Sequence, residues 1–303
     1  MQTLSITIDA GDDEKKIRSI LKGRLGFSSH AIGGLTRTEN GILLNGAPAF
    51  STAIVHTGDT LTALISDRRP SHTPVVPCAV PLPIVWEDPY LLVVNKPAGM
   101  VSLASSFLPE TPTVAGALAY QRGMEELFHV VNRLDKGTTG LMVVAKSGYV
   151  HNLLRRVLHS SDFSREYLAV CMGCPSPAEG SIDLPIGRDE RSTVARMVRP
   201  DGAPSLSRYQ VLRRAGPYAL IRLSPETGRT HQLRVHMAAI GHPLAGDWLY
   251  GTEDPGLIPR PALHSHSLSL RHPVTGELLH LTAPLPEDMT LVLKKGESEY
   301  EKI

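Results

Sequence analysis

The stretch that most restricts how this chain can fold is the loop at 132–140, Asn-Arg-Leu-Asp-Lys-Gly-Thr-Thr-Gly, with the apolar run that follows it. The run Leu141–Lys146 predicts a buried strand, and the two glycines predict a tight loop leading into it. Such a loop presents Arg133 and Asp135 from the edge of a rigid sheet. Taken alone, Asp135 is equally well explained as a turn residue, because Asp bonds readily to backbone N–H groups two residues on. Other parts of the chain must decide between a turn and a catalyst.

Length and composition favour a globular protein with a large body and a smaller module. The chain has 303 residues, of which 42% are hydrophobic and 20% charged. No apolar run approaches the ~20 residues that span a membrane, and the start lacks a basic region followed by an apolar core. We therefore expect a cytoplasmic protein without membrane contact, and a monomer.

The three cysteines do not indicate a disulfide framework or a zinc site. Cys78, Cys171 and Cys174 are few and unevenly spaced, which argues against structural disulfides. Cys171-x-x-Cys174 has the spacing of a zinc half-site, but no second pair exists to complete four ligands. We interpret this pair as small apolar residues in a strand.

Positive charge is concentrated in one span although the whole chain carries only +1. From Arg188 to Arg234 there are ten arginines, no lysine and four acids, a local charge of +6. Arginine suits planar, bidentate contact with phosphate, so this span is a candidate RNA-binding surface. The alternative is a salt-bridged face whose missing acids come from elsewhere in the fold.

The N-terminal part shows the pattern of two short basic helices followed by strands. An amphipathic helix is expected over 12–25, a second helix capped by Ser28 or Ser29, a hairpin turn at Asn45-Gly46, and a strand within 57–65. Residues 10–66 resemble the αL RNA-binding module of a ribosomal protein, which predicts an RNA-binding module over 1–68. The proline-rich segment 69–83 predicts an extended linker.

The rest of the chain alternates strands, helices and turns. We expect the following elements: strands before and after the Asp88-Pro89 turn, a helix over 113–121, a helix over 150–158, a strand over 165–171, a strand over 264–270 and a turn over 272–277. The charged residues 291–303 predict a frayed C-terminal tail.

The segment 227–237, Thr-Gly-Arg-Thr-His-Gln-Leu-Arg-Val-His-Met, predicts a turn followed by a helix. The free N–H groups and positive dipole of such a helix start favour an anion. His231 and His236 are five residues apart, so on one helix they face different ways and do not make the zinc-binding pair of a metalloprotease helix. We predict no metal site.

Residues 84–290 resemble the RluA family of RNA pseudouridine synthases. Five motifs in the family's order carry the resemblance: Leu92–Gly99, Arg133–Leu141, Arg165–Tyr167, Thr227–His236 and Gly246–Gly251. The resemblance implies an α+β pseudouridine synthase fold with a large mixed, mainly antiparallel sheet flanked by helices and loops, beside the small α/β module. Many relatives have histidine where this chain has Asn132.

The resemblance also implies an activity and its residues. The enzyme would convert uridines of structured RNA to pseudouridine without a cofactor. Large-subunit ribosomal RNA is the favoured substrate, and transfer RNA is the alternative. Asp135 would be the catalytic carboxylate, Arg229 its opposing guanidinium, and Tyr167 the residue that stacks on uracil and acts as base. Arg133 would fill the space left by the flipped base. Further RNA contacts are expected from Lys96, Arg165 and Arg234.

Two other classes of function remain open at this point. One is an RNA-binding or ribosome-assembly protein without catalysis, which would not need the set Asp135, Tyr167 and Arg229. The other is a metal-dependent hydrolase that uses the histidines, and activity that survives a chelator would exclude it.

Overall fold

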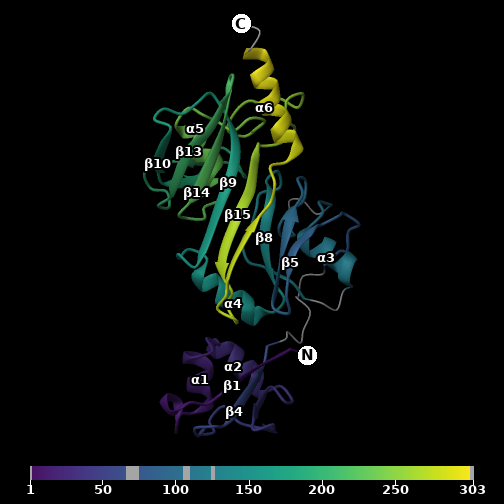
Figure 1. Cartoon of the computed structure of the whole chain (residues 1–303), viewed down its shortest axis with the longest axis vertical. Coiled ribbons are helices and arrows are strands. Elements are labelled where there is room, and N and C mark those ends of the chain that lie inside the picture. Colours follow the sequence, from purple (N-terminus) through teal and green to yellow (C-terminus); the bar gives the residue numbers. More distant parts are fainter. Residues whose placement is uncertain (1, 66–74, 105–109, 124–126, 301–303) are drawn as a thin grey trace.

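The structure, a computed structural model, describes residues 2–65, 75–104, 110–123 and 127–300. It has a small N-terminal part and a larger part built on a long sheet (Figure 1). In the small part four strands pair in the order β1-β4-β2-β3 beside two helices. The elements are β1 (Thr3–Thr7), η1 (Ala10–Asp12), α1 (Ile17–Gly23), α2 (Ser29–Thr36), β2 (Ile42–Leu44), β3 (Ala47–Pro48) and β4 (Thr60–Leu64).

Local chemistry explains most of this module. The Ser28 hydroxyl accepts a hydrogen bond from the Ala31 amide and caps α2, as predicted. Asn45 and Gly46 both have positive φ and form the predicted hairpin turn between β2 and β3. The predicted first helix is shorter, because Glu14 has φ 57° and the chain enters α1 only at Ile17.

The large part is an α+β fold around a ten-stranded mixed sheet, which confirms the predicted fold class. Its main order is β10-β13-β14-β9-β15-β8-β6-β5, with β16 beside β15 and β7 beside β8. Among the strand pairs of this sheet within the described ranges, only β15 and β8 run parallel. The sheet strands are β5 (Ile84–Glu87), β6 (Leu91–Lys96), β7 (His129–Val130), β8 (Thr139–Ala145), β9 (Phe163–Met172), β10 (Glu179–Asp183), β13 (Leu206–Ala215), β14 (Tyr218–Pro225), β15 (Leu263–Arg271) and β16 (Leu278–Thr282).

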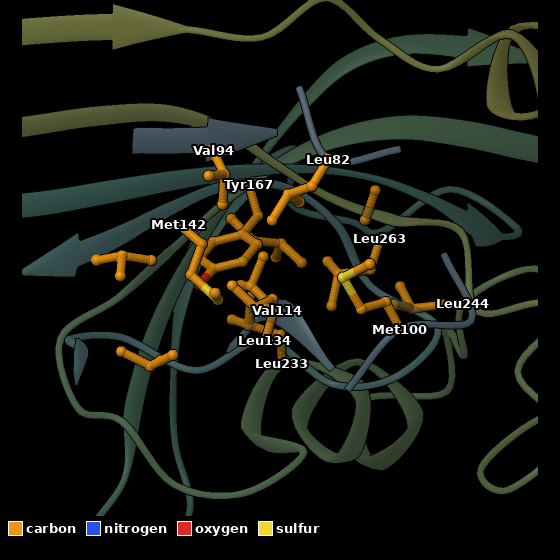
Figure 2. Close-up of a cluster of buried hydrophobic side chains, with 14 of the residues drawn as sticks. Leu82, Val94, Met100, Val114, Leu134, Met142, Tyr167, Leu233, Leu244 and Leu263 are labelled. Carbon is orange, nitrogen blue, oxygen red and sulfur yellow. The ribbon is translucent and has the colours of Figure 1, made fainter. Parts of the chain in front are cut away.

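Helices and a short hairpin complete this part. They are α3 (Val114–Arg122), α4 (Gly148–Val157), α5 (Gln232–Ala239), α6 (Glu287–Tyr300) and the hairpin of β11 (Ile186–Arg188) with β12 (Arg196–Val198). One apolar cluster includes Leu134, Tyr167, Leu233 and Leu263, which come from segments far apart in sequence (Figure 2). The loop before β8, the strand β9 and the helix α5 are therefore held by one common core. Within the described ranges no helix is both long and apolar enough to cross a membrane.

The predictions for the linker and for the C-terminal tail need correction. Of the predicted linker, 69–74 lies outside the described residues, and 75–83 has no helix or strand. However, Leu82 is only 2% exposed and belongs to the core of the large part, so the end of this segment is packed rather than a free spacer. The frayed tail is wrong up to residue 300: α6 continues to Tyr300, and Val292 and Leu293 are buried in an apolar cluster with Met289. Their spacing on one helix face explains this packing.

The N-terminal module contacts the large part through α4. The ring of Tyr149 stacks on Phe27 with 4.3 Å between centroids, and its hydroxyl donates to the Leu25 carbonyl at 2.8 Å. The amide of Gln2 also donates to the Pro89 carbonyl. Figure 1 shows the module below α4, at the end of the long sheet away from α6.

Candidate active site

An open pocket of about 620 Å³ lies where the loop before β8, β9 and the start of α5 meet. Its lining includes the three residues predicted to be catalytic, Asp135, Tyr167 and Arg229. Arg133, Arg165 and Arg234 line the same pocket. The structure thus brings six of the seven predicted site residues to one place, and Lys96 is the exception.

The loop that carries Asp135 is anchored from several directions. The Ser102 hydroxyl donates to the Leu134 carbonyl at 2.7 Å and accepts from its amide at 2.9 Å. A Cβ on Gly140, which has φ +109°, would lie 2.2 Å from the Ser265 carbonyl oxygen. Only glycine fits this position, because β15 approaches β8 too closely for a side chain. These contacts fix the loop that carries the Asp135 carboxylate, just before the start of β8.

Asp135 faces a buried ion-pair network. Its side chain is 31% exposed, and Oδ2 lies 3.6 Å from Nη1 of Arg234. Arg234 also makes a bidentate pair with the fully buried Asp247, with both N···O distances at 2.7 Å. Burial alone would lower the pKa of the Arg234 guanidinium, but Asp247, with smaller contributions from Asp135 and Tyr250, outweighs this effect and the pKa is raised. A permanently charged arginine is therefore held beside the Asp135 carboxylate.

The structure reverses the positions predicted for Arg229 and Arg234. Arg229 was expected opposite Asp135, and Arg234 was expected to contact RNA. Instead Arg234 is 5% exposed and faces Asp135, whereas Arg229 is exposed at the pocket rim and its Nε donates to the Pro204 carbonyl at 3.2 Å. The reason is the helix start: Arg234 lies on α5 and points into the core, while Arg229 lies in the preceding loop.

Lys96 is wrong as a predicted RNA contact, because its side chain is 0% exposed. Its ammonium donates to the carbonyls of Pro97 and Met100 at 2.9 and 2.8 Å, with Lys136 at 3.4 Å. Burial lowers its pKa to about 7, although the negative charge of Asp135 opposes this shift. Lys96 therefore ties the end of β6 to the loop behind Asp135 instead of meeting solvent.

The other predicted cations lie on the pocket wall. Arg133 is exposed and makes no ion pair with any acid in the part of the chain that the structure describes. The guanidinium of Arg165 lies over the Phe163 ring at 5.7 Å, and its Nε is buried without a hydrogen-bond partner among the described residues. Both residues can offer N–H donors to a bound anion.

Tyr167 lies in β9 with its side chain in the core, where Figure 2 shows it among Val94, Met142 and Leu134. It also lines the pocket, as Asp135 does. Burial raises the pKa of Tyr167, which keeps the hydroxyl protonated at neutral pH.

The segment before α5 forms a tight, polar turn. The Gln232 Oε1 accepts from the Thr227 hydroxyl at 2.7 Å and from the Arg229 amide at 3.0 Å. His231 was predicted on the helix, but it precedes α5 in a left-handed conformation, and its Nδ1 lies 2.7 Å from the Tyr250 hydroxyl. No group of three His, Cys, Asp or Glu side chains in the described ranges is arranged to hold a metal ion.

The arginine-rich span is largely compensated by acids. Arg199 pairs with Asp201 and Glu190, and Arg208 pairs with Glu226. Acids from outside the span also contribute, since Glu297 pairs with Arg213, Glu166 with Arg222 and Asp247 with Arg234. The alternative of a salt-bridged face therefore holds for much of the span, and the rim arginines of the pocket are the better RNA-binding candidates.

Sequence reasoning missed three residues of the network: His231, Asp247 and Tyr250. Asp247 and Tyr250 belong to the motif Gly246–Gly251, but their distance of more than ten residues from Arg234 hid the contact. The departure at Asn132 has a structural explanation, because its Oδ1 accepts from the Val143 amide at 2.8 Å and ties the loop to β8.

A carboxylate beside a fixed guanidinium, a tyrosine in the pocket wall and a cationic rim are the features of an enzyme that acts on a nucleotide. A sequence profile of the RNA pseudouridylate synthase family matches residues 90–239. The chain is also 36% identical over 274 residues to the RNA pseudouridine synthase YjbO of Bacillus subtilis, covering 90% of this chain and 96% of the relative. This protein belongs to the RNA pseudouridine synthases, in the RluA family. It is an isomerase that converts uridine in RNA to pseudouridine.

Two more comparisons describe the subgroup and the fold. The chain is 38% identical over 239 residues to the ribosomal large subunit pseudouridine synthase D of Vibrio parahaemolyticus, covering 73% of each chain. The solved structure of human RNA pseudouridylate synthase domain containing 1 superposes with a TM-score of 0.55 at 30% identity, covering 67% of this chain and 83% of that one. The family and the fold agree with the motifs in the sequence.

Proposed function

We propose that this enzyme modifies uridine in large-subunit ribosomal RNA and that Asp135 is its catalytic carboxylate. The observation that carries the proposal is the position of Asp135, on an anchored loop, facing the pocket and 3.6 Å from Arg234. The reaction breaks the bond between uracil and ribose and rejoins the base through carbon, with no redox change. A carboxylate beside a fixed guanidinium can attack or stabilise the sugar or base during this exchange.

Other residues have supporting roles in the proposal. Tyr167 packs against the uracil from the pocket wall, and this role has more support than that of a base, because a protonated phenol must first lose its proton. Arg133, exposed at the pocket, enters the RNA stack where the uridine leaves it. Arg165 and Arg229 contact phosphates at the rim.

The names of relatives support ribosomal RNA as the substrate, since several proteins 36–38% identical to this chain are named ribosomal large subunit pseudouridine synthase D. The N-terminal module has the two helices and hairpin expected of an RNA-binding unit, and its contact with α4 holds it beside the catalytic part. In the proposal it binds a second region of the same RNA.

The test replaces the carboxylate without changing its shape. Asp135→Asn should abolish pseudouridine formation while RNA binding stays close to that of the wild type. Asp183→Asn, at an exposed position of β10, is the matched control and should keep full activity. Turnover near the wild-type rate in Asp135→Asn would contradict the assignment of Asp135 as the catalytic carboxylate.

The substrate is tested separately in cells. Pseudouridines are mapped in total RNA from cells with and without the gene, and from cells that carry only Asp135→Asn. We expect sites in large-subunit ribosomal RNA to disappear in both altered strains. Loss confined to transfer RNA would overturn the substrate but not the carboxylate.

A further inference from the structure

His231 is held in an unusual conformation next to the carboxylate. Its φ of 57° places it in the left-handed region, which residues other than glycine seldom adopt. The side chain is only 15% exposed, and its Nε2 lies 3.9 Å from Oδ2 of Asp135. Such strain persists only where the surroundings hold it, and it is common at functional sites.

The tautomer of His231 follows from the hydrogen bonds of Tyr250. The Tyr250 oxygen accepts from the Arg196 backbone amide at 2.8 Å and lies 2.7 Å from Nδ1 of His231. If Nδ1 also donated, the hydroxyl hydrogen would have no acceptor among the described residues. The hydroxyl therefore donates to Nδ1, and a neutral imidazole then carries its proton on Nε2.

Nε2 of His231 lies near the same carboxylate oxygen that Arg234 faces. Nη1 of Arg234 is 3.6 Å and Nε2 of His231 is 3.9 Å from Oδ2 of Asp135. Both distances are longer than a hydrogen bond. The two nitrogen atoms lie on the Oδ2 side of the carboxylate, within reach of a hydrogen bond after a small shift.

The motif Gly246–Gly251 supports this arrangement from behind. Asp247 pairs with Arg234, and its Oδ1 also accepts from the Leu249 and Tyr250 amides at 3.1 and 3.3 Å. The Arg234 guanidinium lies over the Tyr250 ring at 5.0 Å. A single buried carboxylate thus fixes both Arg234 and the residue that orients His231.

We propose that His231 is a positioning residue: as the Nε2–H tautomer set by Tyr250, it holds Oδ2 of Asp135 together with Arg234 and so presents Oδ1 to the uridine. The inference rests on the proposed role of Asp135. Burial, helped by Arg234 and Arg196, lowers the pKa of His231 against the opposing effect of Asp135, which keeps the ring neutral near pH 7. A neutral donor orients the carboxylate without adding a second positive charge that would weaken it as a nucleophile.

The test is a double-mutant cycle on the full-length enzyme, with single-turnover rates and KM measured on the RNA that the wild type modifies. His231→Ala should lower kcat by roughly 100-fold with KM changed less than about threefold, because an orienting donor is lost and RNA contacts are kept. His231→Gln, which can place an N–H near Nε2, should recover part of the rate. Tyr250→Phe should cost roughly 10-fold, and His231→Ala/Tyr250→Phe should be no slower than His231→Ala.

The controls separate positioning from folding. His280→Gln and Tyr209→Phe change the same residue types in β16 and β13, outside the pocket lining, and should keep the wild-type rate. If His231→Ala does not fold, as judged by its urea midpoint, the cycle of His231→Gln with Tyr250→Phe takes its place. A folded His231→Ala variant within twofold of the wild-type kcat, or additive losses in the cycle, would overturn the proposal. An active Asp135→Asn would instead remove the role of Asp135, so the two failures are distinguishable.

Discussion

The arginines of the pocket differ in burial and in pairing between its floor, beside Asp135, and its solvent-exposed rim. On the floor, Arg234 is buried and fully engaged by Asp247 while it faces Asp135. At the rim, Arg133 and Arg229 are exposed, and the Nε of Arg229 donates a hydrogen bond to the Pro204 carbonyl. A buried charge must be paired to be tolerated, which fixes its geometry, whereas an exposed charge is free to follow a phosphate. We therefore expect floor variants to change stability and kcat, and rim variants to change RNA affinity and base extraction.

The largest effect is expected from Arg234→Met. It leaves Asp247 buried without its partner, which should cost about 3–5 kcal/mol of the free energy of unfolding. It also removes the guanidinium beside Asp135, so kcat should fall at least about 100-fold in any protein that remains folded. Urea unfolding and single-turnover assays measure the two effects.

Arg213→Met is the matched control, because Arg213 pairs with Glu297 on the surface with both side chains 41% exposed or more. An exposed pair contributes about 0–1 kcal/mol. If both variants lost the same stability, the distinction between buried and exposed arginines would not hold.

The next prediction concerns pH and the buried Lys96, which lies outside the pocket lining. Its pKa is lowered to about 7, so between about pH 7 and pH 10 the unfolded chain binds a proton that the folded protein does not. Stability contributed by this group must therefore rise with pH across this window, by at most about 1.4 kcal/mol per pH unit. Lys96→Met should remove this rise and also lower stability at every pH, because the carbonyls of Pro97 and Met100 lose their donor.

The measurement is the free energy of unfolding in urea at pH 7, 8 and 9. The difference between wild type and Lys96→Met should grow with pH. Lys22→Met, at an exposed position of α1, should run parallel to the wild type. A difference that stays constant from pH 7 to pH 9 would show that Lys96 is charged in the folded protein.

At the rim, Arg133→Ala should mainly impair extraction of the uridine. Removing the target base from a paired stem costs a few kcal/mol, and a bulged uridine costs less. We expect a loss of roughly 10- to 100-fold on a stem with a paired target and a clearly smaller loss when the same uridine is bulged. Lys136→Ala, an exposed cation of the same loop, should affect both substrates alike. Equal losses for Arg133→Ala on the two stems would contradict this role.

Local patterns in the sequence were enough to predict most of the fold. The β5–β6 hairpin, the helix α3, the strand β9 and the β15–β16 turn all follow from short-range periodicity and turn chemistry. The C-terminal helix α6 was missed because its charged residues outnumber the few apolar ones. Yet Met289, Val292 and Leu293 lie on one face and find a core contributed by β9, β13 and β14.

The site was only partly predictable, because motifs give the residues and not their directions. Arg229 and Arg234 lie in one motif, and the point at which α5 begins decides which of them faces Asp135. Lys96 looks like a surface cation in sequence, but three carbonyls from later loops enclose it. His231 belongs to the site only because a left-handed residue and Tyr250 turn its ring towards Asp135. These are tertiary contacts, which local propensity does not encode.

The smallest effect should come from Arg229→Ala, which tests the difference between floor and rim arginines most directly. If Arg229 contacts one phosphate, its loss should weaken RNA binding a few-fold and lower the slope of log affinity against log salt by roughly 0.7–0.9. The chemical step should be unchanged at saturating RNA, because the guanidinium beside Asp135 is that of Arg234. Arg271→Ala, an exposed arginine paired with Asp162 at the end of β15, should leave both the slope and the rate unaltered. A large fall in kcat with an unchanged salt slope would place Arg229 on the floor of the site and return it to the role that its motif alone predicted.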